Sequence, residues 1–453
     1  MHTTDPTTGK RIKVYPEFSL RKVDSILNRA EKSFQSWRLL SFKDRRVMMM
    51  KVAGILRRNK DQYAKLMAQE MGKPLAQGQA EIEKCAVVCN FYAQQAEHFL
   101  SPELIHTEAS KSFITYLPLG IVLAVMPWNF PFWQVFRCVA PTLMAGNAVV
   151  LKHASNVCGC ALAIEHIFKE VGFPPGLFSN VFISSPKVKD LIEHPLVKAV
   201  SLTGSTGAGM SIASHAGAVL KKAVLELGGS DPYIILEDAD LEMAVETCVN
   251  SRLINGGQSC IAAKRFIVED SVFNEFEERF TARMQLQRIG PPLHEGINLG
   301  PMARHDLRDH LHGQVQKSIK QGAKLLLGGA IPLGKGSFYP PTVLTHVRPG
   351  MVAYQEELFG PVAAIIKVAD EQEAIQTAND TVFGLGAAVF TRDIKRGEQI
   401  AAKELQAGCC FVNDFVKSDF LLPFGGIKQS GYGRELGELG IREFVNIKTV
   451  YVK

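Results

Sequence analysis

The chain has 453 residues and a net charge of +6, with 46% hydrophobic and 21% charged residues. A chain of this length buries a large core and is expected to divide into two or three domains. Its charge is modest and Lys and Arg form no dense block, so nucleic-acid binding is not expected.

Cysteine usage and the apolar runs exclude further classes. The nine cysteines are an odd number without a CxxC pair, so neither a disulfide framework nor a metal site is predicted. Residues 1–18 lack the apolar segment of a signal peptide. The longest apolar run, 120–126, is too short to cross a bilayer. We expect a cytoplasmic protein with no membrane partner.

The first hundred residues have the pattern of helices. Ser41 followed by Asp44 resembles a helix N-cap, and apolar residues then recur at helical spacing until Gly72-Lys73-Pro74. A second long helix is predicted over 75–100, before Ser101-Pro102.

After residue 120 short β-rich runs alternate with helical segments. Strands are predicted over 121–126, 148–151, 178–183, 197–203, 223–227, 233–236, 266–268, 325–327, 363–368, 387–390 and 410–412. This alternation predicts an α/β fold with parallel sheets covered on both faces. Gly228-Gly229 is the expected domain boundary. The tail 445–453 is predicted to be a lone edge strand that can add to a partner subunit.

Cys260 lies in a glycine-rich polar turn, Asn255-Gly256-Gly257-Gln258-Ser259-Cys260. The other cysteines lie in apolar or helical surroundings, where cysteine usually acts as a small hydrophobe. Two glycines allow the backbone to approach a ligand closely. From these residues alone, a reactive cysteine and a structural turn are equally plausible.

Four other segments carry polar, proline or glycine residues at positions where packing of the core does not require them. Asn129 is held between two prolines after a buried strand, where its amide can stabilise an oxyanion or simply close a turn. The run 203–209 leads a strand into a glycine-rich helix start that suits a phosphate, but it is neither GxGxxG nor a P-loop. Glu226 ends an apolar strand as a candidate general base or an ion-pair partner. Glu357 lies just before Phe-Gly-Pro, and its carboxylate either points at a ligand hydroxyl or is simply solvated.

Together these segments resemble the NAD(P)-dependent aldehyde dehydrogenase superfamily, and the resemblance covers essentially the whole chain. The matching motifs are PWNFP at 127–131, GST at 204–206, ELGG at 226–229, GQSC at 257–260, ELFGP at 357–361, PFGG at 423–426 and SGYGRE at 430–435. Within the superfamily the chain is most similar to the bacterial succinate-semialdehyde dehydrogenases.

The resemblance implies an aldehyde dehydrogenase-like fold in three parts. A Rossmann-type NAD(P)-binding domain would comprise 1–105 and 120–227, and an α/β catalytic domain 228–428. A small β arm, 106–119 with 440–453, would serve oligomerisation, giving a homodimer or a homotetramer.

The resemblance also implies the catalytic roles. Cys260 would attack the aldehyde to give a thiohemiacetal, whose oxyanion is held by the Asn129 amide and the Cys260 backbone N–H. Hydride transfer would leave a thioester, which water activated by Glu226 hydrolyses. An unperturbed thiol is mostly protonated at neutral pH, so the site must lower its pKa or supply a base.

For NAD or NADP, the resemblance places the pyrophosphate near Ser205, the nicotinamide ribose on Glu357 and the adenosine ribose on Lys152. Ser155 stands where strongly NAD-selective members often carry a glutamate, so NADP is expected to be accepted as well as NAD. The implied cofactor residues are Trp128, Lys152, Ser155, Gly204, Ser205, Glu357 and Phe359.

For the aldehyde substrate, the resemblance suggests Arg137 for a distal carboxylate, with a hydroxyl from Ser418. A structural ion pair is the alternative for Arg137. A second arginine found in several semialdehyde enzymes is replaced by Ile254.

Other functions remain as alternatives. The nearest is a broad-specificity aldehyde dehydrogenase acting on other small aldehydes or semialdehydes. A CoA-acylating enzyme is disfavoured by Glu226, and a non-catalytic binding protein by the joint presence of Cys260, Asn129 and Glu226. A phosphate-binding NTPase is disfavoured because no lysine follows Gly209.

Overall fold

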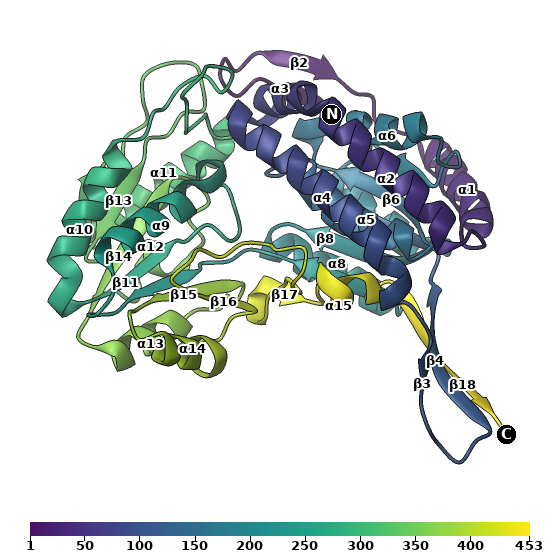
Figure 1. Ribbon diagram of the computed structural model, residues 1–453. Coiled ribbons are helices and arrows are strands. Elements are labelled where there is room, and N and C mark those ends of the chain that lie inside the picture. The colour runs from purple at the N-terminus through teal and green to yellow at the C-terminus, as the bar shows by residue number, and fades with distance from the viewer.

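A computed structural model describes all 453 residues and shows two sheet-centred lobes with a projecting β arm (Figure 1). In one lobe a six-stranded sheet has the order β17-β9-β8-β5-β6-β7. Its strands are β5 (Ile121–Met126), β6 (Ala148–His153), β7 (Phe178–Asn180), β8 (Val197–Thr203), β9 (Lys222–Glu226) and β17 (Gly431–Tyr432). All pair in parallel except β17, which runs antiparallel to β9.

The other lobe contains a seven-stranded sheet with the order β12-β13-β14-β11-β10-β15-β16. Its strands are β10 (Pro232–Ile235), β11 (Arg265–Glu269), β12 (Lys324–Leu327), β13 (Thr342–Thr345), β14 (Val362–Val368), β15 (Gly386–Phe390) and β16 (Cys409–Val412). Only the edge strand β12 is antiparallel. The α/β class with parallel sheets is confirmed, and each predicted strand is present, although the bounds differ by a few residues.

Helices cover the sheets, as expected for strands that are apolar on both faces. In the lobe of the six-stranded sheet they are α1 (Leu20–Trp37), α2 (Phe42–Arg58), α3 (Lys60–Met71), α4 (Leu75–Phe99), α5 (Trp133–Met144), α6 (Cys158–Val171), α7 (Val188–Glu193), α8 (Thr206–Ala218) and α15 (Gly437–Arg442). In the other lobe they are α9 (Leu241–Leu253), α10 (Asp270–Gln285), α11 (His305–Lys320), α12 (Val352–Gln355), α13 (Glu371–Asn379) and α14 (Ile394–Gln399). None is long and apolar enough to cross a membrane.

The start of α2 follows from its sequence. The Ser41 hydroxyl accepts the backbone N–H of Asp44 at 3.1 Å, which is the predicted N-cap. The helical run then breaks at Asn59 and ends at Gly72, whose φ of 80° favours glycine. The predicted helix over 75–100 is α4.

The arm is a three-stranded sheet of order β18-β4-β3, formed by β3 (Glu103–Leu104), β4 (Lys111–Pro118) and β18 (Val445–Val452). The tail is therefore not the lone strand that we predicted, because it pairs with β4 along its full length. Its outer edge is open, and Ile447, Tyr451 and Val452 are exposed there. The N-terminal hairpin of β1 (His2–Thr4) and β2 (Arg11–Val14) was not predicted either.

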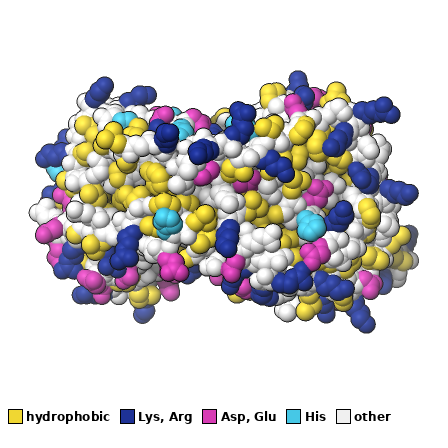
Figure 2. All heavy atoms as spheres, turned by 90° about the horizontal axis from the view of Figure 1, so that it is seen from above, with side chains coloured by type: hydrophobic (Ala, Val, Ile, Leu, Met, Phe, Trp, Pro, Cys, Tyr) yellow, Lys and Arg dark blue, Asp and Glu magenta, His cyan; other side chains and the backbone are white.

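The chain passes from the six-stranded to the seven-stranded sheet between β9, which ends at Glu226, and β10, which begins at Pro232. The C-terminal β17 returns to the first sheet, and β3 lies in the arm although 1–105 was assigned to the cofactor domain. The division into functional domains stays a prediction. Seen from above, the molecule has two lobes with a narrower middle, and basic and acidic side chains intermingle on that face (Figure 2).

Candidate active site

The six-stranded sheet reverses its order at β5, which pairs with the later β6 on one side and with β8 on the other. In parallel sheets, ligands bind beyond the carboxyl ends of the strands at such a reversal. Six of the predicted site residues lie at or just beyond these strand ends: Trp128, Asn129, Lys152, Ser155, Gly204 and Ser205.

The start of α8 offers donors to a phosphate. The Ser205 hydroxyl caps the helix by accepting the Ala208 N–H at 3.3 Å. The backbone N–H groups of Thr206 and Gly207 have no partner in the chain. Unsatisfied donors at a helix N-terminus suit an anionic group.

Lys152 and Ser155 lie at the carboxyl end of β6. Lys152 is largely buried, and burial lowers its pKa while no carboxylate acts on it. Ser155 lines a cavity of about 550 Å³ whose opposite wall includes Arg304 and His305. This space can hold a large polar ligand.

The cysteine turn is held in a conformation that needs glycine. Asn255 and Gly257 have positive φ angles of 53° and 73°. A Cβ on Gly257 would lie 2.2 Å from the carbonyl oxygen of Gly360. The local glycines therefore serve close backbone packing around the reactive segment.

Asn129 is tied to this turn. Its Nδ2 donates to the Gln258 carbonyl at 3.1 Å, and Asn255 Nδ2 donates to the Asn129 carbonyl at 2.7 Å. An amide nitrogen has two N–H donors, so one remains for a ligand. The Cys260 backbone N–H also has no partner. The chain thus leaves two free donors near the sulfur.

Cys260 is partly exposed and lines a cavity of about 270 Å³. The walls of the cavity are mainly apolar, formed by Phe130, Trp133, Ile254, Ile261, Val416 and Phe424. Burial raises the pKa of the Cys260 thiol to about 12, while Arg137 and Lys264 act in the opposite direction. The protein without ligands therefore does not lower the thiol pKa, and a base is needed.

Glu226 ends β9 as a buried carboxyl, 2% exposed, and neither of its oxygens has a hydrogen-bond partner. Burial raises its pKa well above the usual range, which suits a general base. Its side chain does not line the cavity of Cys260. The base role stays a prediction.

Arg137 projects from α5 and forms a buried ion pair with Glu435. Its Nη2 also donates to the Thr203 hydroxyl at 3.3 Å. Arg137 touches the cavity of Cys260, yet only 1% of its side chain is exposed. The ion pair that was the alternative interpretation is thus present, and binding of substrate by Arg137 stays a prediction.

Glu357 lies on the cofactor side of the cysteine. Its Oε1 accepts the Gly229 N–H at 3.2 Å and lies 3.5 Å from Lys264 Nζ. A Cβ on Gly228 would lie 2.4 Å from Glu357 Oε2, so the Gly-Gly pair admits the carboxylate. The Phe359 ring packs edge to face with Trp128, 5.8 Å between centroids.

Three buried residues that support the site were missed by sequence reasoning. Lys264 Nζ donates to the Cys260 carbonyl at 2.7 Å. His153 accepts the Ala154 N–H on Nδ1, so its Nε2–H donates to the Pro131 carbonyl at 2.9 Å and fixes the turn of Asn129. Glu81 accepts two N–H groups at the start of α5. Their partners lie in distant segments or on backbone atoms, so no local sequence signal identified them.

Ser418 lies in the loop before Pro423 and faces the cavity of Cys260. Its hydroxyl oxygen accepts Lys84 Nζ at 2.7 Å and Trp133 Nε1 at 3.2 Å. Lys84, on α4, also lines the cavity and was another residue that the sequence did not single out.

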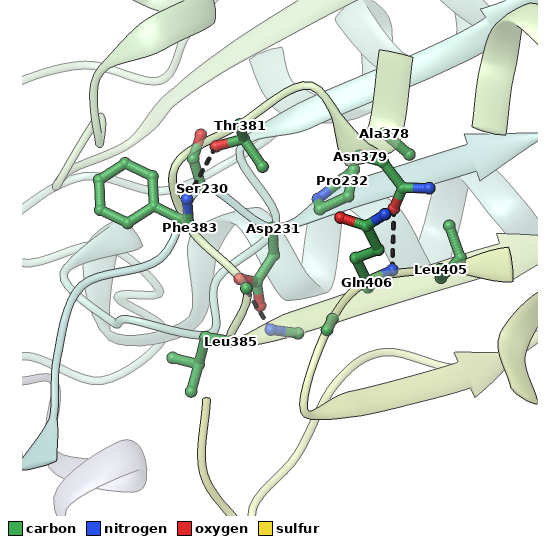
Figure 3. Close-up of a pocket in the computed structure, with 14 residues that line it drawn as sticks. Ser230, Asp231, Pro232, Ala378, Asn379, Thr381, Phe383, Leu385, Leu405 and Gln406 are labelled. Atoms are coloured by element: carbon green, nitrogen blue, oxygen red, sulfur yellow. Dashed lines mark hydrogen bonds between the residues drawn. The ribbon is translucent and has the colours of Figure 1, made fainter. Parts of the chain in front are cut away.

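A second, smaller cavity lies beside β10 and β15 (Figure 3). Asp231 faces it, accepts the Gly386 N–H at 3.1 Å, and has its pKa raised to about 7 by burial. The cavity volume of about 10 Å³ is that of one water and excludes a cofactor. No group of three His, Cys, Asp or Glu side chains is arranged to hold a metal ion.

Comparison with known proteins identifies relatives over the full length. The sequence profile of the aldehyde dehydrogenase family matches residues 1–450. A probable NADP(+) succinate-semialdehyde dehydrogenase of Synechocystis sp. is 49% identical, with 99% of both chains covered. An NAD(P)+ succinate semialdehyde dehydrogenase of Escherichia coli is 45% identical, covering 99% of this chain and 96% of the relative. The crystal structure of the Streptococcus pyogenes succinic semialdehyde dehydrogenase with NADP+ aligns with a TM-score of 0.97 at 37% identity, covering 100% and 99%.

Proposed function

Since the chain belongs to the aldehyde dehydrogenase family, we propose that it oxidises succinate semialdehyde to succinate with NAD or NADP. The observation that carries the proposal is an apolar cavity with Cys260 exposed in its wall and cationic side chains around it. Such a cavity suits a short aliphatic aldehyde that ends in a carboxylate. The names of the full-length relatives support the same substrate.

The chain supplies the groups for each step. The Cys260 thiol gives its proton to Glu226, which passes it on to solvent, and Sγ attacks the aldehyde carbon. The free N–H groups of Cys260 and Asn129 stabilise the oxyanion. When bound, NAD(P)+ accepts the hydride, which leaves a thioester on Cys260. Glu226 then takes a proton from water, which attacks the thioester, releases the thiol and gives the carboxylate.

Several features fit a dinucleotide. The free N–H groups at the start of α8 suit its pyrophosphate. Lys152 and Glu357 would hold the two riboses, and Trp128 with Phe359 would flank the nicotinamide. Ser155 brings no negative charge to the adenosine ribose, so a 2′-phosphate is accepted. Ser155→Glu is expected to lower kcat/KM with NADP by about 100-fold through charge repulsion, and with NAD only slightly.

We infer that the arm joins subunits into a homodimer or homotetramer in the cytoplasm. The free edge of β18 and its exposed apolar side chains support pairing with a second copy. Light scattering of the purified protein measures the number of subunits. A monomer at all concentrations would contradict this assembly.

The proposed function is tested by measuring kcat/KM for a panel of aldehydes with NAD and with NADP. Succinate semialdehyde is expected to give a kcat/KM at least about tenfold above that of butanal, its uncharged four-carbon analogue. The apolar walls of the cavity make a broad-specificity aldehyde dehydrogenase the second candidate. Equal kcat/KM for the two aldehydes would favour that candidate.

A further inference from the structure

Two lysines line the cavity of Cys260 besides Arg137. Lys417 is exposed and ion-paired with Asp414, whereas the surroundings of Lys84 differ. Lys84 extends from α4 toward the same space. Its Nζ lies 4.1 Å from the Trp133 ring centroid and donates to the Ser418 hydroxyl at 2.7 Å. Lys84 is half-buried, and it forms no ion pair with a carboxylate.

The nearby acids are already engaged. Glu81 is ion-paired with Lys73, and its other oxygen accepts the N–H groups of Phe132 and Trp133. Asp419 accepts the backbone N–H of Leu421 at 2.9 Å. The chain therefore does not neutralise the Lys84 ammonium by a direct contact.

The hydrogen bonds of Ser418 leave further donors. Its oxygen accepts from both Lys84 and Trp133, which fills its two lone pairs, so its own O–H proton is free to donate. Lys84 uses one of its three N–H groups on Ser418 and keeps two. A cation and a hydroxyl with unused donors thus face an apolar cavity, which is an arrangement that favours a carboxylate.

We infer that Lys84, with Ser418, binds the distal carboxylate of the semialdehyde, an assignment that rests on the proposed function. The aldehyde carbon then lies at Cys260 and the methylene groups lie against the apolar walls. Arg137 borders the same cavity, but its guanidinium is already paired with Glu435, so we assign the main contact to Lys84. Lys84 is thereby a specificity-determining residue that acts on binding of charged substrates and not on the chemical step.

Lys84→Met tests this assignment, since methionine keeps the apolar stem and removes the ammonium. The variant is expected to raise KM for succinate semialdehyde by about 10- to 100-fold, the value of a charged hydrogen bond. The ratio of kcat/KM for succinate semialdehyde to kcat/KM for butanal is expected to fall by about tenfold or more. Lys84→Arg is the matched control and recovers part of the affinity. Equal loss on both aldehydes, or no loss on either, would overturn the assignment.

A binding measurement separates this assignment from the proposed function. Succinate is expected to slow alkylation of Cys260 by iodoacetamide in the parent protein, and protection is lost in Lys84→Met but retained in Lys84→Arg. Absence of protection in the parent, or equal protection in Lys84→Met, would refute carboxylate binding by Lys84. If protection behaves as expected while the parent oxidises butanal as well as succinate semialdehyde, the assignment holds and the proposed substrate is wrong. Thermal unfolding checks that the variants are folded.

Discussion

Arg137, which is buried, and Lys84, which is half-buried, both border the cavity of Cys260, and their partners differ. Arg137 has a carboxylate, Glu435, and lies over the Phe424 ring at 4.8 Å. Lys84 has a hydroxyl and an aromatic face but no carboxylate. A cation paired within the chain is less available to a ligand, because its charge is already partly neutralised. A cation without an anionic partner in the chain is available to an anionic ligand.

The first prediction concerns the carboxyl beside Arg137. Glu226→Gln is expected to lower steady turnover by about 10²- to 10⁴-fold, the usual contribution of a general base. The loss is the same for succinate semialdehyde and butanal, because hydrolysis of the thioester does not involve the distal end of the substrate. Stopped-flow absorbance should still show a burst of NADH. Turnover at the parent rate would exclude Glu226 as the base.

The second prediction removes the paired cation. Arg137→Ala leaves Glu435 buried without its ion-pair partner, so the free energy of unfolding should fall by about 3–5 kcal/mol. Denaturant unfolding measures this loss. Activity toward succinate semialdehyde and butanal should fall together. If only the charged aldehyde is affected, Arg137 binds the substrate carboxylate as the sequence first suggested, and the comparison with Lys84 breaks down.

The third prediction extends the comparison to the cofactor side. Lys152 is also a largely buried cation without a carboxylate partner. By the same logic it serves a ligand, and Lys152→Met should raise KM for NADP by about tenfold. KM for the aldehyde should be unchanged. Initial rates at saturating aldehyde give the first value. A shift confined to the aldehyde KM would contradict the assignment of Lys152 to the cofactor.

The fourth and smallest effect is on pH dependence. Burial lowers the pKa of Lys84 to about 8, with Arg137 acting in the same direction and Cys85, Asp419 and Glu81 opposing. Below pH 8 the ammonium is intact, so KM for succinate semialdehyde should be constant. Above that pH the proton is lost, and KM should rise by up to about tenfold per pH unit. KM for butanal, measured in parallel, corrects for other titrations. A flat ratio of the two KM values would show that Lys84 does not bind the carboxylate.

Local sequence patterns predicted most helices and strands, because the formation of a helix or strand depends largely on residues that are close in the sequence. The alternation of apolar strands and helices predicted every strand of the two sheets except β13 and the antiparallel β17. The short strands β1, β2 and β3 were missed, since polar residues on exposed strands carry little periodic signal. The longer arm strands β4 and β18 lie within the segments 106–119 and 440–453 that the resemblance implied. The pairing of β18 with β4 joins segments more than 300 residues apart, and no local rule encodes it.

The same distinction holds for the site. The turn of Cys260, the fixed Asn129 and the apolar setting of Glu226 could be read from neighbouring residues, because glycine, proline and flanking leucines act over a few positions. The partners of Arg137 and Lys84 could not. Lys84 meets Ser418 across 334 positions, and Glu435 reaches Arg137 only because the chain returns to the first sheet through β17.

The amino-acid sequence by itself thus determined the α/β class and the residues at the strand ends, and it singled out Cys260 as the candidate nucleophile. Only the tertiary structure decided which charge is neutralised and which is left for a ligand. The physical reason is that the state of a charge depends on the groups around it in space, and folding brings those groups from distant parts of the chain.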